Sequence, residues 1–133
     1  QKPKSDIFGL RDVDKMAILT ECKSVDENNK VEQNKCLKDV LTKKILDRLP
    51  EFREIGDSLQ LNDAEMKLQI IMDKDGYVKK IKSMSGGNAY LGRFVEKVFE
   101  GFKETIEFDP AKIEGKNVNI FIHLPIKYVR NRE

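Results

Sequence analysis

His123 is the only histidine of the 133 residues, and histidine is the side chain best suited to acid–base catalysis near neutral pH. It lies on the polar side of an alternating run near the C-terminus, with no serine or cysteine at a spacing that indicates a nucleophile. A small hydrolase would need a nucleophile and a base in one pocket. We therefore interpret His123 as a surface residue and predict that the chain has no catalytic residue and is not an enzyme.

Two glycine-containing segments have the composition of ligand-binding loops. Asp73-Lys74-Asp75-Gly76 resembles part of a calcium loop, but the twelfth position of an EF-hand loop requires Glu, and Met84 stands there. Gly86-Gly87 precedes a helical pattern, where a phosphate could bind, but the fixed spacings of phosphate-binding loops are absent. We predict a hairpin turn and an ordinary loop, with no metal and no cofactor.

Cys22 and Cys36 are the two cysteines of the chain. A bridge between them would close a loop of about 14 residues, stabilise the fold by about 3 kcal/mol in the chain-entropy model, and require an oxidising compartment. The alternative is a pair of buried thiols in a cytosolic protein. The polar loop 23–30 has few apolar residues to hold it in place, which favours the disulfide. The sequence has neither a Cys-x-x-Cys motif nor a Cys/His cluster, so we do not expect a zinc site.

Composition and charge limit the classes of protein to which this chain can belong. Hydrophobic residues make up 39% and charged residues 36%, and 25 Lys+Arg against 23 Asp+Glu leave a net charge of +2. These values predict one globular domain and no binding to nucleic acid; the cluster of Lys79, Lys80 and Lys82 is interpreted as a solvated face. No apolar run approaches the roughly 20 residues of a membrane span. Gln1 fits either a mature chain or a piece of a longer one.

Two segments have the three-and-four spacing of an amphipathic helix. The first is predicted to begin after Asn34 as its N-cap and to end at Leu49, because Pro50 disfavours helical geometry before it. Residues 50–62 are expected to form an irregular connection. The second follows Asn88 and carries a stripe that includes Phe94, Phe99 and Phe102, which is interpreted as core.

Three segments have the period of two that is typical of a half-buried strand: residues 64–72, 77–84 and 118–128. The first two flank the Asp73–Gly76 turn and predict a hairpin, with a bulge near Lys79-Lys80. The last is the longest, and Pro125 predicts that it lies at or next to a sheet edge, since proline cannot donate to a ladder.

These elements predict an α+β fold in the order helix, strand, strand, helix, strand. The expected architecture is a three-stranded antiparallel sheet with both helices packed on one face. We expect an N-terminal arm over 1–15, with one short extended stretch around Met16 to Leu19 after it, a domain over 16–129 and a tail over 130–133. An edge strand with unpaired amides and carbonyls can accept an extended peptide as a further strand.

Several segments occur in an order that resembles the C-terminal domain of the TonB energy-transducer family. They are the hairpin from Lys67 to Val78, the helix rich in Val and Phe, and then Phe108-Asp109-Pro110-Ala111, Gly115-Lys116-Asn117-Val118 and Leu124-Pro125-Ile126-Lys127-Tyr128. The resemblance covers roughly Met16 to Tyr128. The cysteine pair is similar to that of Bacteroidetes-type versions of the domain. Leu49-Pro50 replaces the usual Tyr-Pro after the first helix, which puts transporter coupling in question.

The resemblance implies a periplasmic domain whose last strand receives the TonB-box peptide of an outer-membrane transporter and relays force to it. Carried onto this sequence, the receiving edge is the strand from Val118 to Tyr128. Its peptide-binding residues are expected to be Val118, Asn119, Ile120, Phe121, Ile122, His123 and Leu124. The alternative is a free-standing exported domain that binds another envelope protein or pairs with itself as a homodimer. An upstream membrane helix with a proline-rich spacer would indicate the first function, and Gln1 as a mature N-terminus would favour the second.

Overall fold

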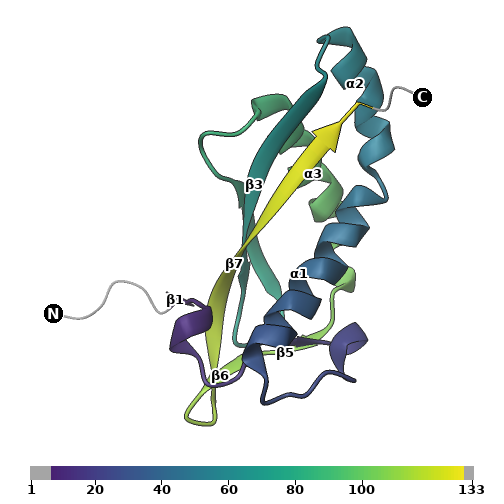
Figure 1. Ribbon diagram of the computed structural model, residues 1–133. Coiled ribbons are helices and arrows are strands. Elements are labelled where there is room, and N and C mark those ends of the chain that lie inside the picture. The colour runs from purple at the N-terminus through teal and green to yellow at the C-terminus, as the bar shows by residue number, and fades with distance from the viewer. Residues whose placement is uncertain (1–6, 131–133) are drawn as a thin grey trace, which may run out of the picture.

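The structure is a computed structural model in which residues 7–130 are described. Its helices are α1 (Lys30–Leu46), α2 (Arg53–Ser58) and α3 (Ala89–Phe102), and its short 3₁₀ turns are η1 (Leu10–Asp12), η2 (Thr20–Cys22), η3 (Leu49–Phe52) and η4 (Lys103–Thr105). Its strands are β1 (Ile7–Phe8), β2 (Ile18–Leu19), β3 (Asp63–Met72), β4 (Val78–Ser83), β5 (Phe108–Asp109), β6 (Ala111–Ile113) and β7 (Lys116–Val129), arranged as Figure 1 shows.

The main sheet has β3 at its centre, with β7 and β4 antiparallel on either side. The prediction of a three-stranded antiparallel sheet is wrong in its details, because the sheet has five strands and is mixed. β1 pairs parallel with β7 at Asn119 and Ile120, and β6 pairs antiparallel with residues 116–118. These added strands have two or three residues each, too few for a period of two to be recognised.

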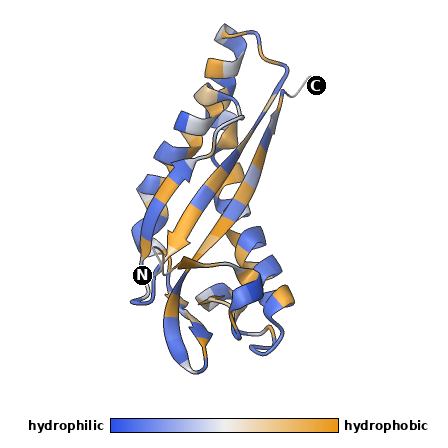
Figure 2. Ribbon diagram, turned by 90° about the vertical axis from the view of Figure 1, so that its left-hand side faces the viewer, coloured by the Kyte–Doolittle hydropathy of each residue, from blue (hydrophilic) through white to orange (hydrophobic). Residues whose placement is uncertain are grey.

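One face of the sheet is buried and the other faces solvent. Along β3, Leu68, Ile70 and Met72 are buried while the residues between them are not, and β7 continues the alternation. Figure 2 shows hydrophobic and hydrophilic residues alternating along the strands. Both long helices contribute to the core on the buried face, α1 with Leu37, Leu41 and Ile45 and α3 with Leu91, Val95 and Phe99. The prediction of both helices on one face is confirmed.

The N-terminal segment belongs to the fold from residue 7 onward. Val13, Met16, Ala17 and Leu19 are almost completely buried, and β2 pairs antiparallel with β5. The predicted arm over 1–15 is therefore wrong for residues 7–15, and its first six residues lie outside the described part of the chain. The predicted extended stretch after it contains β2.

Helix α1 begins earlier than predicted. Its N-cap is Asn29, whose side chain accepts a hydrogen bond of 3.1 Å from the Glu32 amide. Asn34 lies inside the helix instead. The connection predicted as irregular contains η3 and α2, because Pro50 lies in the first turn of η3, where its missing N–H is not needed.

The predicted hairpin is confirmed. Gly76 adopts a φ of 92°, and the Asp73 carboxylate accepts hydrogen bonds from the amides of Asp75 and Tyr77. Ile71 pairs with Lys80 and the next residue of β3 pairs with Val78, so Lys79 is the extra residue of the predicted bulge. The second predicted helix is confirmed as well, with Asn88 as its cap.

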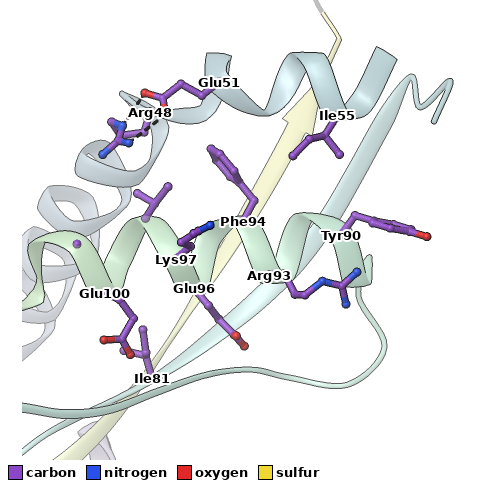
Figure 3. A pocket seen from close by; sticks show the side chains of 12 residues that line it. Arg48, Glu51, Ile55, Ile81, Tyr90, Arg93, Phe94, Glu96, Lys97 and Glu100 are labelled. Carbon is purple, nitrogen blue, oxygen red and sulfur yellow. Dashed lines mark hydrogen bonds and ion pairs between the residues drawn. The ribbon is translucent and has the colours of Figure 1, made fainter. Parts of the chain in front are cut away.

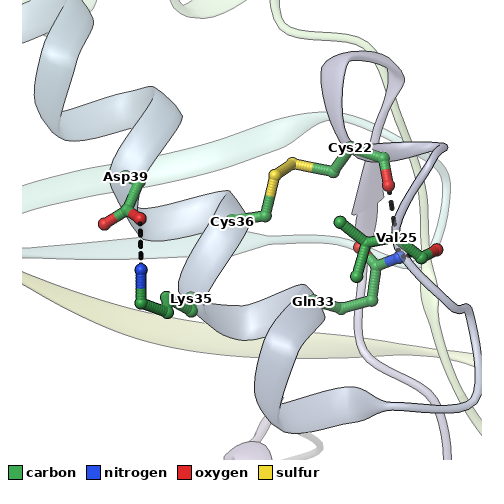
Figure 4. Close-up of a disulfide and its surroundings, with 6 residues drawn as sticks. All are labelled: Cys22, Val25, Gln33, Lys35, Cys36 and Asp39. Atoms are coloured by element: carbon green, nitrogen blue, oxygen red, sulfur yellow. Dashed lines mark hydrogen bonds and ion pairs between the residues drawn. A yellow bond between two sulfur atoms is a disulfide. The ribbon is translucent and has the colours of Figure 1, made fainter.

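The structure contains the disulfide between Cys22 and Cys36, which joins η2 to α1 (Figure 4). The loop between them is also held by Gln33, whose buried amide donates to the carbonyls of Val25 and Cys22 at 2.8 and 3.3 Å. The N-terminal segment is thus attached to α1 by a covalent bond and by hydrogen bonds.

Replacing both cysteines, Cys22→Ala with Cys36→Ala, is expected to lower the free energy of unfolding by about 3 kcal/mol, because the unfolded chain gains loop entropy. Urea denaturation monitored by circular dichroism measures the change, and the reduced wild-type chain serves as the control that should match it. A double variant as stable as the oxidised chain would show that packing alone holds the loop.

Candidate peptide-binding edge of the sheet

The outer edge of β4 is partly closed. Its ladder is interrupted by the bulge at Lys79, and the amide of Ser83 donates to a carboxylate oxygen of Glu96 from α3 at 2.7 Å. The lysines at 79, 80 and 82 are exposed along it. A bulge, a short length and lysine side chains are the features by which natural sheets prevent a further strand from pairing.

The outer edge of β7 is covered only at one end. β1 pairs with Asn119 and Ile120, and beyond that point no strand among residues 7–130 pairs with β7 on the side away from β3. β6 pairs with the first residues of β7, before the region that β3 occupies. The stretch 121–129 is therefore a free edge on the longest strand of the sheet.

The ladder fixes which backbone groups of β7 point outward. The carbonyl of Lys67 accepts a hydrogen bond from the Met84 amide, on the side of β4, so the backbone of Lys67 points away from β7. Lys67 is opposite Pro125, and the two form a non-hydrogen-bonded pair. Alternation along the strand then directs the N–H and C=O groups of Phe121, His123, Lys127 and Val129 outward.

Pro125 occupies a position that the ladder permits. Its backbone points outward, so its missing N–H removes no hydrogen bond to β3. In the parallel register with β1, the residues that flank Ile120 make the hydrogen bonds to Phe8, so the Phe121 amide is already used. The free edge consequently offers donors at His123, Lys127 and Val129, with an interruption at Pro125. A strand added here would find a carbonyl but no amide at that point.

The seven residues predicted for the receiving edge have different positions. Val118 pairs with Ala111 of β6, and Asn119 and Ile120 pair with β1. Of the rest, Phe121 and His123 point their backbone outward, whereas the backbone groups of Ile122 and Leu124 point to β3, where these residues pair with Ile70 and Leu68. The structure brings only the second half of these seven residues, from Phe121 to Leu124, to the free edge.

Residues 125–129 also belong to the free edge, and the predicted receiving strand included this stretch as far as Tyr128. The amide of Lys74 in the hairpin turn donates to the side-chain oxygen of Asn119 at 2.8 Å. Asn119 therefore has a structural role in attaching that turn to β7.

On the solvent face, Phe121 and His123 form a small half-buried cluster. Their ring centroids are 5.3 Å apart, and the His123 Nε2 lies 3.3 Å from the Gln69 side-chain nitrogen on β3. The Phe121 ring also covers Gly9, where an added Cβ would lie 3.2 Å from it. His123 thus contacts an aromatic ring and an amide.

Lysines surround this cluster. The pKa of His123 is lowered from its ordinary value by burial first, and then by the positive charges of Lys67 on β3 and Lys38 on α1. Helix α1 contacts β7 directly. Asn34, Lys38 and Thr42 recur at intervals of four and are all half-buried, so they form one side of α1. We name these three residues the α1 flank.

The other candidate loops have structural roles. The Asp73 carboxylate closes the hairpin turn, and in the part of the chain that the structure describes no three Asp, Glu, His or Cys side chains cluster as metal ligands. Gly87 is required by packing, because a Cβ there would lie 2.8 Å from the Met66 Cα and 3.0 Å from the Glu65 carbonyl oxygen.

None of the helices between residues 7 and 130 combines the length and the apolar composition of a membrane-spanning segment.

Comparisons with known proteins give a likeness at the level of structure. No family model matches the sequence, and no characterised protein matches it. Among solved structures, the chain is similar to the NMR solution structure of the Helicobacter pylori TonB-CTD, with 15% sequence identity and a TM-score of 0.47. The alignment covers 68% of this chain and 81% of that one.

The position of His123 can be tested by an NMR titration, since no other histidine contributes signals. We expect its pKa below the ordinary 6.5, and we expect Lys67→Gln to raise it by removing a nearby positive charge. The control Lys127→Gln lies on the same face and should leave the pKa unchanged. A native pKa at or above 6.5 would contradict the half-buried, cation-flanked position of His123.

The same lowered pKa predicts how stability depends on pH. Below about pH 6.5 the unfolded chain binds a proton that the folded chain resists, so the free energy of unfolding should decrease as the pH falls through this range. His123→Gln should remove this part of the decrease and leave stability above pH 7 largely unchanged. Chemical denaturation at a series of pH values measures it; identical pH profiles for variant and wild type would refute it.

Proposed function

We propose that this domain binds an extended peptide of a partner protein by strand addition along residues 121–129 of β7. The observation that carries the proposal is the free edge itself: it belongs to the longest strand, and from His123 onward its outward N–H and C=O groups have no partner strand among residues 7–130. Strand addition satisfies such groups and gives affinity through backbone hydrogen bonds. The β4 edge is the weaker candidate because Lys79 and Glu96 obstruct it.

The added strand would have two different faces. On the solvent side its side chains would lie beside Phe121, His123 and Lys127, and on the other side they would lie beside the α1 flank. Alternate side chains of the peptide would therefore meet an aromatic and basic surface on one face and a polar helix on the other. Each backbone hydrogen bond contributes about 0.5–1.5 kcal/mol net, so affinity would depend on several of them.

The partner that fits best is the TonB-box peptide of an outer-membrane transporter. The order of the hairpin, the Val- and Phe-rich helix and the segment Leu124 to Tyr128 supports this, because it resembles the TonB C-terminal domain. We propose that the edge starts at Phe121 and not at Val118, since β1 already pairs with Asn119 and Ile120. The proposed location is the periplasm, an oxidising compartment that agrees with the disulfide.

In this function the domain performs no covalent chemistry. It would act as the mechanical link between a motor in the inner membrane and the transporter, and the peptide would transmit the load. The disulfide and the paired strands β3 and β7 would resist local unfolding under that load.

Titrating ¹⁵N-labelled protein with TonB-box peptides from transporters of the source organism tests the proposal. We expect the largest amide shifts at residues 121–129. An absence of shifts at millimolar peptide would exclude capture of this peptide and favour another envelope partner. Light scattering that shows dimers at high concentration, with the same residues shifted, would favour self-pairing instead.

Lys127→Pro tests the backbone contribution in particular. It removes one outward N–H and, as Pro125 shows, leaves the β3 ladder intact, so we expect the native fold and about two- to tenfold weaker peptide binding. Lys127→Gln is the matched control, which removes the charge and keeps the N–H. Equal affinities for the two variants would show that residue 127 makes no backbone contact with the peptide.

A further inference from the structure

Three rows of side chains cross the solvent face of the main sheet, the face opposite the two long helices. Residues directly opposite one another in an antiparallel pair have their side chains on the same face of the sheet. The first row contains Lys80, Ile71 and Phe121, the second Lys82, Gln69 and His123, and the third Lys67 and Pro125. We name the surface formed by these three rows the cationic face.

Apart from His123, the ionisable residues of the cationic face are all lysines. Lys67, Lys80 and Lys82 are exposed, and within residues 7–130 none of them lies within ion-pair distance of a carboxylate. The pKa of His123 agrees with this balance, because after burial the charges that lower it are those of Lys67 and Lys38. The middle of the sheet therefore presents positive charge that the described fold does not compensate.

The carboxylates at the borders of this face are engaged elsewhere. Glu65, in the next row, pairs with Lys127 at 3.8 Å. Asp12 accepts a hydrogen bond of 3.1 Å from a backbone amide, and Asp73 closes the hairpin turn. Asp75, in the same turn, is preceded by a lysine. An incoming anion would thus meet the lysines without a competing carboxylate inside the face.

The centre of the cationic face is apolar. Ile71 and Phe121 are opposite one another and half-buried, while both long helices pack on the other face of the sheet. The His123 ring lies beside that of Phe121, with 5.3 Å between the ring centroids. Part of this apolar centre is therefore accessible. An apolar residue flanked by carboxylates would match both the centre and its lysine rim.

A hollow of about 910 Å³ between α3 and the η3–α2 segment has no such imbalance. Its walls contain Arg48, Arg93 and Lys97, and also Glu51, Glu96 and Glu100. Figure 3 shows Arg48 and Glu51 joined by hydrogen bonds, which measure 2.6 and 3.0 Å. The balanced charge of this hollow does not select a charged partner, whereas the charge of the cationic face does.

The cationic face is continuous with the peptide edge. Phe121 and His123 belong to both, and β1 occupies the edge of β7 up to Phe121. A partner chain paired along residues 121–129 cannot continue past that point and has to turn away from the strand. The first row leads from Phe121 to Lys80 across two strand spacings, about 10 Å, which about three extended residues span.

We propose that the cationic face docks an acidic segment of the partner protein, the segment that adjoins the edge-bound peptide at the end nearest Phe121. Its carboxylates would face Lys67, Lys80 and Lys82, and an apolar residue between them would contact Ile71. The inference rests on the proposed function, because the peptide edge determines where the segment begins. A protein segment is the occupant because the bound peptide holds it at a high effective concentration beside this face.

The test uses the TonB-box peptide with a short extension of Gly, Glu, Leu and Glu at one end or the other. Matched controls carry Gln in place of Glu, and the peptide without an extension is the reference. In titrations of the ¹⁵N-labelled full chain, the glutamate extension at the end nearest Phe121 should bind about tenfold more tightly than its control. It should add amide shifts at Ile71, Lys80 and Lys82, and its advantage should decrease in about 0.5 M salt.

Two double variants locate the effect. Lys80→Gln with Lys82→Gln should remove most of the advantage of the glutamate extension and leave the binding of the reference peptide unchanged. Lys23→Gln with Lys97→Gln removes the same charge from exposed positions in the disulfide loop and on α3, and the advantage should persist. A general loss of positive charge would affect the two double variants alike, so their difference isolates the cationic face.

Equal affinities of the glutamate and glutamine peptides, with the reference peptide still shifting residues 121–129, would overturn this inference and leave the proposed function standing. No shifts from any of the peptides would overturn both. Binding to anionic lipid vesicles that requires Lys80 and Lys82, without a preference between the two extensions, would assign the face to a membrane surface and overturn the inference as well.

Discussion

The pairing of β3 with β7 is the constraint on which the other features depend. Its register runs from Asp63 opposite Val129 to Met72 opposite Ile120, without interruption. This register sets which side chains of both strands enter the core and which backbone groups of β7 point outward. A slip by one residue would exchange the two faces and move every apolar side chain of β7 to solvent. The core and the free edge therefore follow from one set of hydrogen bonds.

The surfaces proposed for binding are the parts of the molecule that this pairing does not use. The even-numbered residues of β7 from Ile120 to Tyr128 are buried and bonded to β3, while the backbone of the odd-numbered residues from His123 onward points away from it. This edge combines a rigid support with backbone groups left without a partner strand, which is the arrangement expected of a domain that binds without catalysing a reaction.

The sequence predicts long elements well and short ones poorly, for physical reasons. β3, the hairpin and α3 have enough residues for their period to emerge, and Asn88 caps α3 as expected. The start of α1 was misplaced because Gln33, a buried polar residue, occupies the core position of its first turns and conceals the helical period there. β1 changes the candidate site most, since its two residues cover Asn119 and Ile120. No local pattern distinguishes such a segment from a loop.

Amide hydrogen exchange of the free protein tests most directly the claim that residues 121–129 of β7 form a free edge. The account predicts an alternation: slow exchange at Ile122, Leu124, Ile126 and Tyr128, whose amides point to β3, and fast exchange at His123, Lys127 and Val129. Uniformly slow exchange over the whole stretch would show that another segment or a second copy already covers this edge, and would contradict the account.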